Sequence, residues 1–116
     1  MNERSYFITD LFTFTPELPK DSILSRSVFS DDRIQVILFS FTTGQELSEH
    51  TATRPAILHF LEGEADVTLG LDRKQAHAGT WIHMPANLVH SVHAKTDLRM
   101  LLILLASNGE TKTSKP

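Results

Sequence analysis

Short apolar segments alternate along the chain with polar or glycine-containing breaks, and this pattern predicts an all-β protein. Segments rich in Val, Ile, Leu and Phe recur at intervals of roughly ten residues, and each has the length of a strand. The expected strands cover residues 34–43, 56–61, 65–69, 80–84, 88–94 and 98–105. Short strands at even spacing, without a long helical period, are typical of a β-sandwich or β-barrel.

The segment 98–105, LRMLLILL, is apolar at almost every position. Leu and Met favour helices, so a helix is possible on composition alone. The segment is short, however, and it follows a series of strands. We therefore predict a central strand that is covered by protein on both faces.

The two ends of the chain differ from its middle. Residues 1–33 contain an apolar group and then two prolines that break regular structure, so we expect an N-terminal arm and edge strands. The apolar group should pack as a short edge strand against a sheet of its own chain or of a partner; it consists of Phe7, Ile8, Leu11, Phe12 and Phe14. Residues 34–106 form the predicted barrel, and the polar residues 107–116 a flexible tail.

Composition excludes several classes of function. A net charge of -3 and scattered basic residues argue against a nucleic-acid partner, which needs a concentrated basic face. The chain has no cysteine, which excludes disulfides, thiolate metal sites and cysteine nucleophiles. Its N-terminal residues lack a signal-peptide pattern, and no apolar run is long enough to span a membrane. We therefore expect a cytoplasmic protein without a membrane partner.

Two glycine-to-histidine segments organise the middle of the chain. Gly44 is followed six positions later by His50, and Gly79 by His90 after an intervening proline and asparagine. In each case a glycine ends or interrupts a strand, and the histidine lies on a following strand. This arrangement suggests that both imidazoles face a single chamber.

The two segments resemble the two sequence motifs of the cupin family, which consists of small jelly-roll barrels. The slots of the first motif are taken in order by Gly44, His50, Ala52, Ala56 and Gly63, and those of the second by Gly79, Pro85, Asn87 and His90. Asn87 replaces a family glycine, a mild change because Asn tolerates positive φ. The resemblance covers about half of the chain and implies a single-domain cupin jelly-roll barrel, also described as a double-stranded β-helix.

The resemblance also implies a possible cofactor, one divalent transition metal such as Fe, Mn, Ni or Zn. The family's metal ligands are two histidines and a carboxylate from the first motif and one histidine from the second. Here Ala52 and Ala56 occupy two of those slots, so only His50 and His90 remain as possible metal ligands. Two imidazoles are an incomplete set, because a divalent ion usually takes three or more protein ligands.

Strand alternation places two further histidines. With Ala56 inward, His59 faces outward, and His83 faces outward on a neighbouring strand. A register different by one residue would instead turn His59 and His83 into the chamber. That alternative would complete a histidine-rich metal site with His50 and His90.

The interior that these assignments predict is mostly apolar. Its expected lining consists of Ala52, Ala56, Leu58, Phe60, Met84 and Val92. Arg54 follows His50 at the expected mouth, where it is either a surface residue or a group that holds an anion. Such a cavity suits a small, partly apolar ligand, and either imidazole of the pair could form hydrogen bonds or act as a general base.

Three functions follow from these residues. The first is binding of a small molecule of unknown identity, with little or no catalysis. The second is a metal-dependent enzyme of the cupin dioxygenase or isomerase type, and the third a structural or interaction scaffold. The resemblance implies a homodimer, for which the apolar N-terminal segment and the outward face with His59, Trp81 and His83 supply a surface.

Overall fold

The computed structural model describes residues 5–14 and 17–106 and shows an all-β fold, as predicted. The described residues form a short 3-10 turn, η1 (Leu11–Phe14), and nine strands: β1 (Ile23–Ser30), β2 (Ile34–Phe41), β3 (Glu46–His50), β4 (Ala56–Glu62), β5 (Glu64–Leu69), β6 (Asp72–His77), β7 (Trp81–Met84), β8 (His90–Ala94) and β9 (Leu98–Leu105). Within this part of the chain, no helix has the length and apolar character needed to cross a bilayer.

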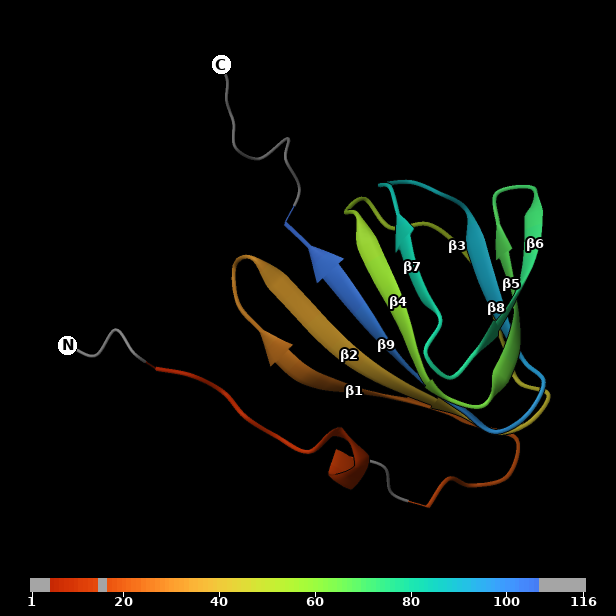
Figure 1. Cartoon of the computed structure of the whole chain (residues 1–116), viewed down its shortest axis with the longest axis horizontal. Coiled ribbons are helices and arrows are strands. Elements are labelled where there is room, and N and C mark those ends of the chain that lie inside the picture. Colours follow the sequence, from red (N-terminus) through yellow and green to blue (C-terminus); the bar gives the residue numbers. More distant parts are fainter. Residues whose placement is uncertain (1–4, 15–16, 107–116) are drawn as a thin grey trace.

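The strands form two sheets that face each other as two layers (Figure 1). The five-stranded sheet has the order β1-β2-β9-β4-β7, and the four-stranded sheet has the order β3-β8-β5-β6. All of these neighbours pair antiparallel. Because strands distant in sequence are neighbours in both sheets, the chain crosses repeatedly between the layers, which makes a jelly-roll barrel.

The core lies between the two sheets and follows from alternation along the strands. Phe41, Phe60 and Met100 are fully buried there, each from a different strand of the five-stranded sheet. The opposing sheet contributes Ala65, Val67, Val92 and Ala94. The segment 98–105 is a central strand, β9, between β2 and β4, as predicted.

Strand β6 is absent from the expected strands. Five of its six residues are exposed, and only Ala76 is buried. It forms the edge of the four-stranded sheet, where one neighbour, β5, supplies its backbone hydrogen bonds. Since its side chains mostly face water, its sequence carries no apolar alternation from which a strand could be predicted.

The expectation of an edge strand in the N-terminal arm is wrong. Residues 5–10 have no regular secondary structure, and residues 11–14 form the turn η1. Asp10 sets this turn, because its carboxylate accepts a hydrogen bond from the Phe12 N–H at 3.0 Å and its carbonyl accepts one from the Thr13 N–H at 3.1 Å. Residues 107–116, expected to be a flexible tail, lie outside the described residues.

Candidate functional site

His50 and His90 are direct cross-strand neighbours at one end of the four-stranded sheet. His50 is the last residue of β3, His90 is the first residue of β8, and their Cα atoms are register partners. The centroids of the two imidazole rings lie 4.2 Å apart, with the ring planes tilted by 58°. The structure therefore brings together the two histidines that the sequence motifs single out.

A backbone carbonyl anchors each imidazole in the same way. The Nδ1 atom of His50 lies 3.0 Å from the Ser48 carbonyl oxygen, and the Nδ1 atom of His90 lies 2.9 Å from the Leu88 carbonyl oxygen. A carbonyl can only accept, so each Nδ1 carries the hydrogen. In a neutral ring the Nε2 atom then holds a lone pair, and both rings present a hydrogen-bond acceptor.

Burial differs between the two rings and favours the neutral form of His90. His90 is only 4% exposed, whereas His50 is exposed. Burial lowers the pKa of His90, and the nearby His50 lowers it further; the hydrogen bond to the Leu88 carbonyl partly opposes this. At neutral pH His90 is therefore an uncharged acceptor.

The lowered pKa of His90 predicts a specific loss of stability in acid. Above about pH 6.5 both the folded and the unfolded states hold this residue neutral, so its contribution is complete. As the pH falls below that value, the unfolded chain takes up the proton first, and stability decreases until the pH passes the folded-state pKa. We expect urea unfolding midpoints at about pH 7.5 and pH 5.5 to differ more in the wild type than in His90→Gln. Equal differences would contradict the assignment.

The floor beneath the pair is packed with apolar side chains. Ala56, Leu58, Phe60, Met84 and Val92 point between the sheets, and none of them is more than 2% exposed. They belong to one continuous core cluster. The site is therefore a shallow position at the end of the barrel, above a filled interior.

The loops around the site are held by backbone and side-chain hydrogen bonds. The Asn87 N–H donates to the Ala52 carbonyl at 2.7 Å, which joins the loop after β3 to the loop before β8. Arg54 is half-buried, and its Nε donates to the Leu105 carbonyl at 2.8 Å. Its Nη2 lies 3.5 Å from the Leu104 carbonyl oxygen. Arg54 thus fastens its loop to the end of β9.

The register that would add His59 and His83 to the site is not the one adopted. His59 pairs with Trp81 and His83 pairs with Ile57, both on the outer side of the five-stranded sheet. The reason is the burial of small and apolar residues at the alternate positions of β4, which turns the odd-numbered positions outward.

The donor set does not fit a divalent metal. Among the described residues, no group of three or more His, Cys, Asp or Glu side chains is placed to hold one. Ala52 and Ala56 carry no donor atoms, so His50 and His90 supply only two nitrogens.

The carbonyl anchors of the two rings were not predicted from the sequence. In both cases the carbonyl belongs to the residue two positions before the histidine, and in both cases a bulge or loop precedes the ring. This repeated i−2 relation in the two motifs is the only signal that could have revealed it.

Two facing antiparallel sheets with crossing connections, and a histidine pair where β3 and β8 meet, define a small jelly-roll barrel with a site at its end. Residues 37–105 match the sequence model of the cupin domain, which is more than half of the chain. The chain belongs to the cupin family.

Solved structures agree with this assignment. A cupin superfamily protein from Desulfitobacterium hafniense is 28% identical with a TM-score of 0.75, over 79% of this chain and 84% of the other. A conserved protein of unknown function from Streptococcus pyogenes is 26% identical with a TM-score of 0.78, over 93% of this chain and 100% of the other. An RmlC-like cupin from Shewanella frigidimarina, at 16% identity and a TM-score of 0.71 over 83% and 86%, shows the fold alone. Comparison with curated protein sequences gave no match.

Proposed function

We propose that this cupin protein binds a small, partly apolar molecule through the histidine pair, with little or no catalysis. One observation supports the proposal most: the rings of His50 and His90 lie 4.2 Å apart, and each is oriented by a carbonyl on Nδ1. Two neutral Nε2 acceptors are then available to the same ligand.

The acceptors restrict the chemistry of the ligand. A carbonyl or carboxylate group offers only lone pairs, which two neutral Nε2 acceptors do not complement. A hydroxyl, phenol or N–H group offers the hydrogen that they need. The rest of the ligand would meet apolar side chains, since the partly buried Leu69, Leu88 and Leu104 pack on the core near this end.

The test compares phenol with anisole, which has a similar ring but no O–H donor. Phenol is expected to shift the imidazole proton signals of His50 and His90 in an NMR titration, and anisole to shift them much less. The double variant His50→Ala/His90→Ala should lose the difference, whereas His77→Ala, an exposed histidine at the end of β6, should keep it. Equal effects of phenol and anisole, or no binding of either, would refute the proposal and leave the scaffold function.

A metal-dependent enzyme is the second candidate, and the ring anchors favour it. Metal-binding histidines usually donate their other ring N–H to a carbonyl or carboxylate, as both rings do here. The number of donors opposes it, as described above. Plasma emission on protein purified without a histidine tag distinguishes the two candidates. About one metal ion per chain, lost in His50→Ala/His90→Ala, would replace the binding proposal by the enzyme.

A further inference from the structure

The outer face of the five-stranded sheet is apolar across its centre. Residues that point away from the inter-sheet core include Ile34, Val36 and Leu38 on β2, Leu101, Ile103 and Leu105 on β9, Ile57 on β4 and Trp81 on β7. Leu38 and Leu101 are 2% and 8% exposed, although neither belongs to the core between the sheets. A sheet face of this kind requires a cover.

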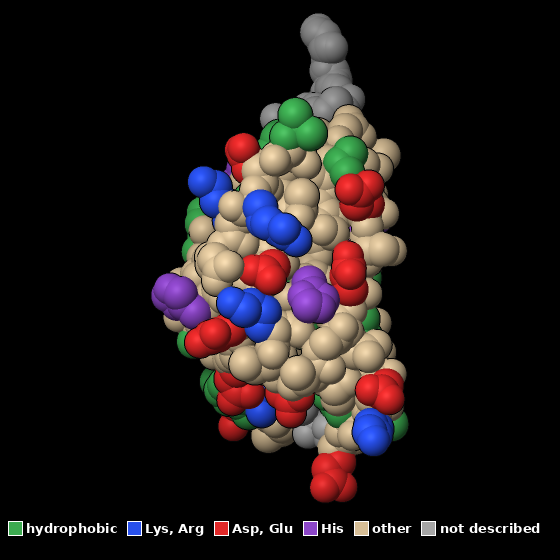
Figure 2. All heavy atoms as spheres, turned by 90° about the vertical axis from the view of Figure 1, so that its right-hand side faces the viewer, with side chains coloured by type: hydrophobic (Ala, Val, Ile, Leu, Met, Phe, Trp, Pro, Cys, Tyr) green, Lys and Arg blue, Asp and Glu red, His purple; other side chains and the backbone are tan. Residues whose placement is uncertain are grey.

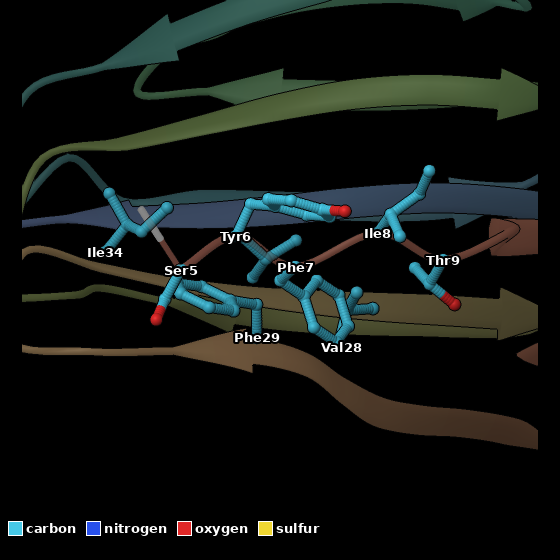
Figure 3. Close-up of a pocket in the computed structure, with 9 residues that line it drawn as sticks. Ser5, Tyr6, Phe7, Ile8, Thr9, Val28, Phe29 and Ile34 are labelled. Atoms are coloured by element: carbon cyan, nitrogen blue, oxygen red, sulfur yellow. The ribbon is translucent and has the colours of Figure 1, made fainter. Parts of the chain in front are cut away.

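The N-terminal arm, residues 5–14, covers only one half of this face (Figure 1). The rings of Phe7 and Phe29 are in contact, with centroids 5.4 Å apart, and the Phe12 ring lies 4.7 Å from the Arg99 guanidinium. Between the arm and the strands β1 and β2 lies a groove of about 700 Å³. In the close-up, Phe7 points toward Phe29 while Tyr6 and Ile8 project to the other side of the arm (Figure 3).

The other half of the face, over β4 and β7, carries no part of the described arm. Trp81 is 57% exposed there, and His83 is exposed beside it. The arm in turn presents Tyr6 and Ile8, which are 87% and 82% exposed. One chain thus contains both a raised apolar arm and a bare apolar strip, at opposite edges of the same sheet.

The two faces of the molecule differ in charge. Figure 2 looks onto the side formed by the four-stranded sheet, where acidic, basic and histidine side chains are scattered over the surface. On the five-stranded sheet, the charged residues at outward positions of β1 and β9 are Arg26 and Arg99, and Arg99 forms an ion pair with Glu62 at 2.8 Å. An apolar, aromatic centre with few charges is typical of a protein interface.

We propose that a second copy of this chain docks on this face, with a two-fold axis parallel to the strands. Such an axis places the β1–β2 edge of one subunit over the β4–β7 edge of the other. The arm of each subunit then fills the space above the bare strip of its partner, so that Tyr6 and Ile8 contact the region of Trp81. Both unsatisfied surfaces of the chain are covered twice by one symmetric contact.

The size of the face is adequate for a stable dimer. Five strands roughly 4.8 Å apart and about seven residues long give a projected area of roughly 500–600 Å², to which the arm adds. A standard interface buries about 800 Å² on each partner. A two-fold axis perpendicular to the strands would instead bring the two arms together and leave both strips bare.

The first experiment measures mass in solution by sedimentation at about 1–100 µM. The wild type is expected to be a dimer, and Trp81→Glu should weaken dimerisation at least about 30-fold, as expected for a central Trp. Ile8→Glu should weaken it as well. Leu71→Glu is the matched control, because Leu71 is fully exposed at the β5–β6 turn of the other sheet, and it should leave the mass unchanged.

The second experiment tests the orientation of the two subunits. The chain has a single Trp and no Cys, so Thr9→Cys carries one spin label and Trp81 supplies the only indole N–H. Labelled chains are mixed with ¹⁵N wild-type chains, whose indole signal should broaden through the partner's arm. A monomeric wild type, a dimer insensitive to Trp81→Glu or to Ile8→Glu, or an unbroadened indole in a mixed dimer would each overturn the proposal.

Discussion

Gly63→Ala is expected to destabilise the fold by about 2–5 kcal/mol, because two costs add at this position. Gly63 joins β4 to β5 with a φ of +88°, a backbone conformation that L-residues adopt at a cost of about 1–2 kcal/mol. A Cβ atom there would also overlap the backbone carbonyl of Asp97, and it would lie 3.0 Å from the Leu98 Cα. Backbone cannot move aside as a flexible side chain can. The measurement is the urea unfolding midpoint at one fixed protein concentration.

Gly44→Ala is the matched control for that prediction. Gly44 has almost the same φ, +87°, but a Cβ there would meet no atom within 4 Å. Its replacement should therefore cost only the backbone term, about 1–2 kcal/mol. If both variants lose the same stability, then the close approach of Asp97 to the β4–β5 turn has no energetic consequence.

Leu58→Ala is expected to cost about 2–5 kcal/mol, since it opens a cavity at the centre of the core. Leu58 is 1% exposed in the middle of β4 and belongs to the cluster beneath the histidine pair. Neighbouring strands hold the surrounding side chains, so the site can collapse only in part. Chemical unfolding at a fixed protein concentration measures the loss.

Leu71→Ala provides the comparison, since the same side chain is removed where it is fully exposed. That change should alter stability by less than about 0.5 kcal/mol. The Leu58→Ala variant also tests the shallow site. If the packed floor excludes a deeper ligand position, the new space should increase the binding of phenol. Unchanged binding would indicate that the ligand position does not extend toward Leu58.

The two predictions concern a fold that was largely readable from the sequence. Period-two alternation predicted most of the strands, because one face of each strand is buried and the other is not. The apolar segment 98–105 was correctly predicted as a central strand. Strand β6 was missed because its single neighbour at the sheet edge demands backbone pairing and few apolar side chains. The arm was misjudged because Asp10 bends it into a turn through local hydrogen bonds.

For the site, the sequence by itself determined which residue types were available: two histidines at motif spacing, and alanines where further ligands would stand. Only the tertiary structure decided that His50 and His90 are register partners, with both rings donating Nδ1–H to carbonyls. Only the structure decided that the interior beneath them is filled. It also placed Arg54 on the carbonyls of β9 and His59 and His83 on the outer face. The physical reason is that residue identity and alternation are local properties, whereas strand register, ring orientation and cavity volume depend on contacts between segments far apart in the chain.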